Sequence, residues 1–155
     1  MSSFSVCLYF SKSVGREEMR RRITALPECR PDPEEPGMYW AGQVHISLGD
    51  VGQEYKVTEI RHTVGLEVGD FYVNLTVFGG DEEGFFEKWD RALDLLAYGE
   101  DAVAIRESAF VMLVQKNGKL TLDSSGKGMS DFYREYVLTK HQAELAPFGQ
   151  LEGVD

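Results

Sequence analysis

Apolar and polar residues alternate along several short stretches of this chain, which is the pattern of β-strands with one face in a core. The alternation is regular at 4–10 and 71–77, and shorter alternating segments between glycines occur at 38–41, 44–48 and 55–62. We expect the two regular stretches to be strands with a strong inner face. We expect the shorter segments to form a meander of antiparallel strands.

A longer period marks the first helix. Met19, Ile23 and Leu26 recur at spacings of four and three residues, which places them on one side of a helix. Ser13 is a candidate N-cap, because its hydroxyl can accept a hydrogen bond from a free backbone N–H. Pro27 cannot continue a helix, so we expect the helix to stop there.

The longest helical pattern ends at Gly99 and has a wide apolar stripe. The stripe consists of Phe85, Phe86, Trp89, Ala92, Leu93, Leu96 and Ala97. We interpret it as core-facing, since an apolar stripe at helical spacing normally packs against the rest of a domain. A third, shorter helix is expected at 132–137 with Ser130 as its N-cap, and the chain from about Pro147 is expected to be a loose tail.

Between these two helices, Asn117-Gly118 predicts a two-residue hairpin turn, because both positions accept a positive φ. In that register Leu113 lies opposite Leu122. Four apolar side chains are then expected on the face under the long helix: Val111, Leu113, Leu120 and Leu122.

The order of strands and helices predicts an α+β fold: an antiparallel sheet with two or three helices packed mainly on one face. With 155 residues, of which 43% are hydrophobic and 27% charged, the chain suits one domain over 1–155. It shows neither a signal-peptide pattern nor an apolar stretch of membrane-spanning length. We therefore expect a cytoplasmic protein with no membrane partner.

The charge balance narrows the choice of partners. Sixteen Lys and Arg against twenty-six Asp and Glu give a formal net charge of -10. Such a surface repels phosphate backbones, so we expect no nucleic-acid partner, and it attracts basic proteins at long range. The two cysteines, Cys7 and Cys29, lack the spacing of metal ligands, and we expect no metal and no cofactor.

No catalytic motif occurs in the chain, and we expect no enzyme. The polar groups that suggest an alternative are His45 and His62, which can meet across the predicted meander. Tyr55 would join them in lining a cavity between sheet and helices. In that alternative the protein is a small ligand-binding domain or an enzyme.

Acidic residues in loops are the remaining candidates for a binding surface. Residues 27–37 contain four prolines and carry Asp32, Glu34 and Glu35 at the expected tip, where proline stiffening lowers the entropy lost on binding. We choose these three carboxylates as the partner-binding site. The secondary candidates, Asp81, Glu82 and Glu83, begin the long helix, where helix capping explains their charges better than binding does.

Residues 72–123 resemble bacterial toxin-immunity proteins of the myxobacterial Sit type. The matching pieces are Leu95-Leu96, Asp101-Ala102-Val103 and the hairpin at 117–123, and residues 4–23 are similar to the family's opening strand and helix. The resemblance implies a cytoplasmic protein that binds one cognate toxin and blocks it. It supplies no catalytic residues.

Three functions therefore stay open. The first is an immunity protein that neutralises a cognate toxin by direct contact, and the negative charge of the chain favours a basic toxin. The second is an acidic secretion-chaperone-like protein that holds an effector segment, a class whose members are usually dimers. The third is the ligand-binding domain or enzyme. Whether the chain is a monomer or a homodimer is left undecided.

Overall fold

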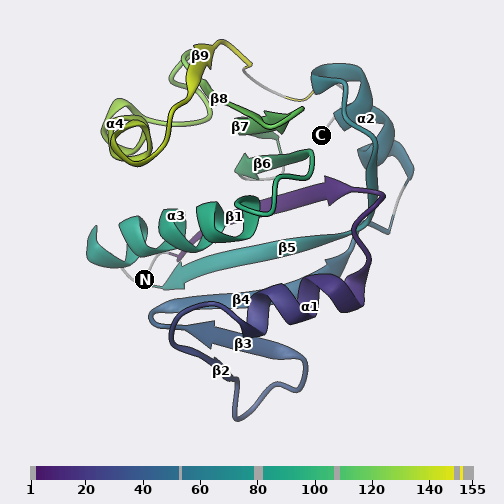
Figure 1. The fold of residues 1–155 in the computed structure, drawn as a ribbon, viewed down its shortest axis with the longest axis vertical. Coiled ribbons are helices and arrows are strands. Elements are labelled where there is room, and N and C mark those ends of the chain that lie inside the picture. The colour runs from purple at the N-terminus through teal and green to yellow at the C-terminus, as the bar shows by residue number, and fades with distance from the viewer. Residues whose placement is uncertain (1–2, 53, 79–81, 107–108, 149–150, 152–155) are drawn as a thin grey trace.

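A computed structural model describes residues 3–52, 54–78, 82–106, 109–148 and 151 of the chain. These residues form an α+β fold with a nine-stranded, mostly antiparallel sheet and four helices (Figure 1). The strands are β1 (Ser3–Ser11), β2 (Cys29–Pro31), β3 (Met38–Ala41), β4 (Val44–Asp50), β5 (Val68–Phe78), β6 (Ala102–Arg106), β7 (Phe110–Lys116), β8 (Lys119–Asp123) and β9 (Glu144–Ala146). The helices are α1 (Arg16–Thr24), α2 (Glu54–Val64), α3 (Glu82–Leu96) and α4 (Asp131–Lys140).

The two regular stretches of the sequence form the centre of the sheet. β1 and β5 pair antiparallel, with Val6 opposite Leu75 and Leu8 opposite Val73, and all four side chains are fully buried. The strand order is β2-β3-β4-β5-β1-β6-β7-β8-β9, so the meander β2–β4 lies beside β5 and the strands β6–β8 lie beside β1. Of the nine strands in the described residues, β9 alone is parallel to its neighbour.

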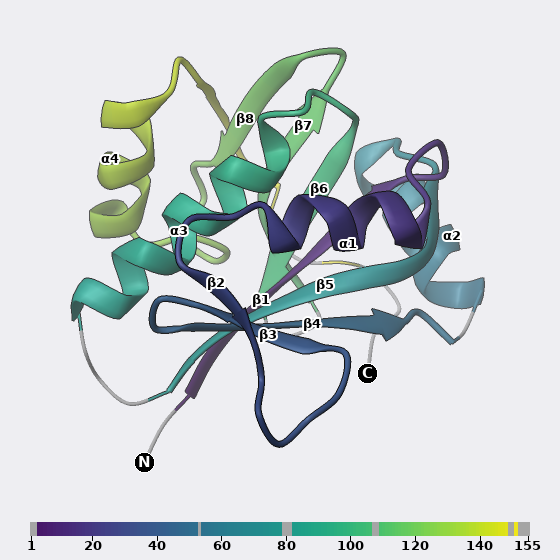
Figure 2. The ribbon, with the colours of Figure 1, turned by 60° about the horizontal axis from the view of Figure 1, so that its bottom comes forward.

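The two faces of the sheet carry separate apolar clusters, because successive side chains of a strand point to opposite faces. One face packs against α1, α3 and α4, with Ile23, Trp89 and Val137 among its buried residues. The other face packs against α2 and the C-terminal segment through Ile60 and Leu151. In Figure 2, α3 and α4 lie at the left and α1 in the middle, whereas α2 lies at the right-hand end of β5.

The prediction of a strand at 55–62 is wrong, because these residues belong to α2. Val57, Ile60 and Val64 recur at helical spacing and pack into the second cluster. The segment is short, and both of its alternating phases mix apolar and charged residues, so a strand pattern and a helical pattern fit it equally well. As α2 lies on the second face, the expectation of two or three helices mainly on one face is corrected to four helices on two faces.

The predicted helix starts have mixed outcomes. α1 begins after Gly15, and Ser13 is not its N-cap, since the Ser13 hydroxyl lies 3.1 Å from that of Ser11. Ser130 is the N-cap residue of α4, as expected, although its side chain makes no capping hydrogen bond.

The hairpin prediction is confirmed in turn and register. Asn117 and Gly118 have φ values of 54° and 76°, and Leu113 lies opposite Leu122. The placement of Val111 under the long helix is wrong. The pairing of β6 with β7 shifts between Ala104 and Ile105, and this irregularity turns Val111 to the α2 face.

Hydrogen bonds to the Asp123 side chain hold the C-terminal part of the chain in place. Its carboxylate is fully buried and accepts hydrogen bonds from the Ser125 hydroxyl (2.8 Å) and from the backbone N–H groups of Gly128 and Phe148 (3.0 Å each). Burial alone would raise the pKa of Asp123, but these donors outweigh it and lower the pKa to about 2. The stretch expected to be a loose tail is therefore held at Phe148, and Leu151 is 2% exposed in the second cluster.

We predict that Asp123→Asn lowers the free energy of unfolding at neutral pH by about 2 kcal/mol, because the amide turns a donor toward other donors. In the native protein this contribution is complete above the ordinary pKa of 3.8 and is lost as the pH falls toward about 2. Urea unfolding of both proteins over this range should therefore show the gap closing. The control Glu17→Gln removes an exposed ion pair with Arg20 and should change stability by less than about 0.5 kcal/mol.

Candidate partner-binding surface

Asp32 organises the loop between β2 and β3. Its Oδ1 accepts hydrogen bonds from the backbone N–H groups of Glu34 (2.8 Å) and Glu35 (3.2 Å), and its Oδ2 accepts one from Trp40 Nε1 (3.0 Å). His45 Nε2 lies 3.2 Å from the same Oδ2. The bond from the Glu34 N–H is the largest cause of a pKa of Asp32 below its usual range. Asp32 is therefore the fixed point of the loop.

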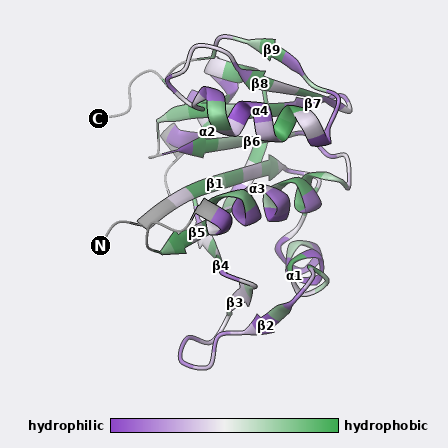
Figure 3. Cartoon of the chain, turned by 90° about the vertical axis from the view of Figure 1, so that its left-hand side faces the viewer, coloured by the Kyte–Doolittle hydropathy of each residue, from purple (hydrophilic) through white to green (hydrophobic). Residues whose placement is uncertain are grey.

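This arrangement separates the three residues chosen from the sequence. The Asp32 side chain is only 10% exposed and its oxygens are occupied, so it positions the loop instead of presenting a free charge. Glu34 and Glu35 are exposed, and Asp32 binds their backbone N–H groups. In Figure 3 the loop is the hydrophilic segment between β2 and β3 that projects at the bottom of the view. It presents two carboxylates in a preorganised conformation.

Beside this loop, one face of the sheet is incompletely covered. Trp40 pairs with His45 and His45 with Thr76 across neighbouring strands, so their side chains share the face opposite α1 and α3. Among the described residues, the apolar cluster under α2 contains none from β3 or β4. At the end of β5, Phe78 is 56% exposed. We call this part of the sheet the open face.

Three rings meet on the open face. The centroids of Trp40 and His45 are 4.9 Å apart in an edge-on arrangement, and Phe78 lies 6.2 Å from each. Neither Trp40 nor Phe78 was among the site residues predicted from the sequence. A signal for Phe78 is present in the sequence, because the apolar alternation of Phe71, Val73, Leu75 and Val77 leaves Phe78 on the other phase of the strand.

The two histidines do not form the predicted joint site. His45 belongs to the ring cluster beside Asp32, whereas His62 is exposed near the end of α2. The side chain of Tyr55, named with them, lies outside the described residues.

The secondary acidic candidates are only partly visible. Asp81 and the side chain of Glu82 lie outside the described residues. Glu83 is exposed in the first turn of α3.

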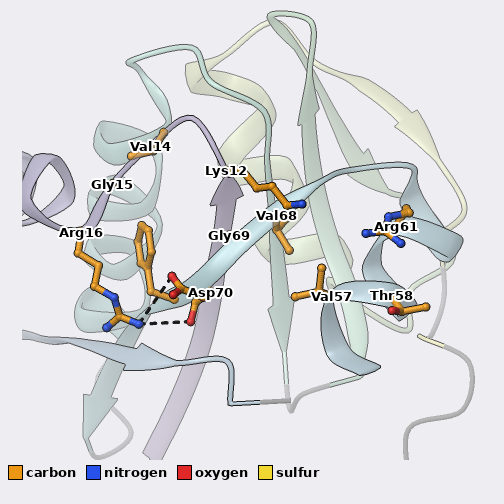
Figure 4. A pocket seen from close by; sticks show the side chains of 11 residues that line it. Lys12, Val14, Gly15, Arg16, Val57, Thr58, Arg61, Val68, Gly69 and Asp70 are labelled. Carbon is orange, nitrogen blue, oxygen red and sulfur yellow. Dashed lines mark hydrogen bonds and ion pairs between the residues drawn. The ribbon is translucent and has the colours of Figure 1, made fainter. Parts of the chain in front are cut away.

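A separate groove of about 630 Å³ lies where the β1–α1 loop, α2 and the start of β5 approach one another (Figure 4). Val57, Val68 and Phe71 form its apolar walls. Its three cationic side chains are engaged with carboxylates. Arg16 binds Asp50 and Asp70, and Lys12 and Arg61 both bind Glu67. Neither His45 nor His62 lines this groove, so a small-ligand site here would use different residues from those predicted.

Comparison of the chain with protein-family models, curated proteins and solved structures finds no match. Within the described ranges, no group of three or more His, Cys, Asp and Glu residues is arranged to hold a metal ion. In the same part of the chain, no helix combines the length and apolarity needed to cross a membrane.

We predict that Asp32→Ala loosens the acidic loop while the sheet stays folded. The substitution removes the acceptor of the backbone N–H groups of Glu34 and Glu35, so these groups should exchange with deuterium about tenfold faster in native conditions. Glu34→Gln is the matched control, because the Glu34 side chain is exposed while its N–H bond to Asp32 is kept. Equal exchange rates in all three proteins would show that Asp32 does not hold the loop.

Proposed function

We propose that this protein is an immunity protein: a non-catalytic protein that neutralises a cognate bacterial toxin by direct contact. The observation that carries the proposal is the acidic loop that Asp32 anchors beside the open face. A preorganised loop next to a half-buried Trp40 and an exposed Phe78 combines a low ordering cost with aromatic side chains of the kind that contribute most to binding energy at interfaces. The resemblance of residues 72–123 to Sit-type immunity proteins agrees with this function.

Charge favours a basic toxin as the partner. A net charge of -10 attracts a positively charged protein over a distance of about one Debye length, which is about 10 Å at moderate salt. The attraction speeds the encounter, and a cell that makes a toxin needs rapid capture. Glu34 and Glu35 would then meet the basic surface first, because they lie on a projecting loop.

Binding of a small ligand is a second candidate function, and the groove in Figure 4 favours it. Its apolar walls and charged rim suit a small amphipathic molecule. We place this function second, because the three cations of the groove already have carboxylate partners, which an incoming anion would have to displace.

Co-expression with the product of the adjacent gene tests the proposal. If that product kills cells when expressed alone, is tolerated beside this protein and elutes with it as a stoichiometric complex, the immunity function is supported. A harmless neighbour that does not co-elute would reject it. Light scattering of the free protein adds the oligomeric state, and a stable homodimer would favour the secretion-chaperone class.

For such a complex, we predict that Glu34→Lys/Glu35→Lys slows association at low salt by about tenfold, with a smaller effect on dissociation. Stopped-flow mixing at two ionic strengths would measure this, and added salt should reduce the difference. The matched control is Glu17→Lys/Glu135→Lys, which changes the net charge equally through exposed residues on α1 and α4. If both double variants slow association equally, net charge and not the loop steers the encounter.

A further inference from the structure

The three rings on the open face lie outside the two apolar clusters that form the core. Trp40, His45 and Phe78 belong to neither cluster. Phe78 is one of the large apolar side chains that remain exposed, at 56%. An apolar ring that stays exposed in the folded chain contributes little to the free energy of folding. When it lies beside other rings, it is a candidate for binding.

Asp32 holds two of the rings in place. The indole N–H of Trp40 and Nε2 of His45 both meet Asp32 Oδ2, at 3.0 and 3.2 Å. Trp40 Nε1 and His45 Nε2 therefore have a hydrogen-bond partner, and the orientation of both rings is set before a partner protein arrives. Phe78 offers most of the accessible ring surface, beside the half-buried Trp40, whereas His45 is only 16% exposed and supports the other two rings.

The charges around the rings select the chemistry of that partner. Glu34 and Glu35 follow Asp32 by two and three residues, and their N–H groups bind the same carboxylate that Trp40 binds, so the two residues lie on the loop that is anchored at Trp40. Arg30 lies opposite Trp40 and therefore on the same face, but its guanidinium is directed to the carbonyl oxygen of Gly42 (3.5 Å) in the β3–β4 turn, at the other end of β3 from the acidic loop. An apolar ligand would desolvate the two carboxylates without compensation, whereas a cation would pair with them.

We propose that Trp40, His45 and Phe78, together with Glu34 and Glu35, bind an arginine side chain of a basic partner protein. A guanidinium is planar, so it stacks on an aromatic ring and forms paired hydrogen bonds with a carboxylate at its edge. The ammonium of lysine lacks the second property. This inference rests on the proposed function for the nature of the partner, a basic protein, but the chemistry of the site can be tested without that partner.

The probe is a short synthetic Arg-Gly repeat peptide, and its control is the same peptide with citrulline, which keeps the planar group and removes the charge. Trp89 is 1% exposed, so changes in tryptophan fluorescence on titration report on Trp40. We expect the citrulline peptide to bind about tenfold more weakly, and a lysine peptide to lie between the two.

Phe78→Ala should weaken binding of the arginine peptide by about fivefold. Phe132→Ala is the matched control, because Phe132 is equally exposed at 56% but lies on α4. It should leave the affinity unchanged. Phe78→Leu keeps an apolar side chain at the strand end, so a loss of affinity in this variant too separates the role of the ring from any effect on folding.

Equal binding of the arginine and citrulline peptides, or equal effects of Phe78→Ala and Phe132→Ala, would overturn the inference. Two further outcomes distinguish failure of the proposed function from failure of the arginine site. If the peptides discriminate as expected but no toxin is neutralised, the arginine site stands without the immunity function. If the toxin is neutralised equally by the native protein and Phe78→Ala, and the peptides do not discriminate, the immunity function stands without the arginine site.

Discussion

The antiparallel pairing of β1 with β5 is the interaction on which the rest of this structure depends. Each strand adds neighbours on its free side, so this pair sets the position of both flanking groups of strands. Its register also assigns every side chain to a face. Val6, Leu8, Val73 and Leu75 point to the side of α1 and α3, and the residues between them point to the other side. A slip of one residue would exchange the two faces.

The two faces are covered unequally, and this difference creates the candidate site. Three helices pack over the first face, whereas α2 and the C-terminal segment pack over only part of the second. Trp40, His45 and Phe78 lie on the part that the second cluster does not reach. The acidic loop and the rings are neighbours because the loop joins β2 to β3, and Trp40, His45 and Phe78 lie on the successive strands β3, β4 and β5.

Asp32 and Asp123 show how a carboxylate can serve the fold instead of the surface. Each accepts a backbone N–H from the residue two positions later and then binds a group from a more distant position, Trp40 and Phe148 respectively. In both cases these donors lower the pKa of the carboxylate. In the sequence alone neither differs from a solvated acid, since the distinction lies in donors that only the folded chain brings near.

The sequence by itself determined the α+β class, β1, β5, the long helix and the hairpin at Asn117-Gly118, because these depend on periodicity and turn chemistry, which are local. It also placed the acidic loop and the exposed positions of Glu34 and Glu35. Only the tertiary structure decided that α2 is a helix on the second face, that Asp32 turns inward and that the rings meet beside it. The helix α2 is decided by the packing of Val57, Ile60 and Val64 into the second cluster. The other two features depend on pairing between β2, β3, β4 and β5, and the pattern along one strand does not specify its neighbours.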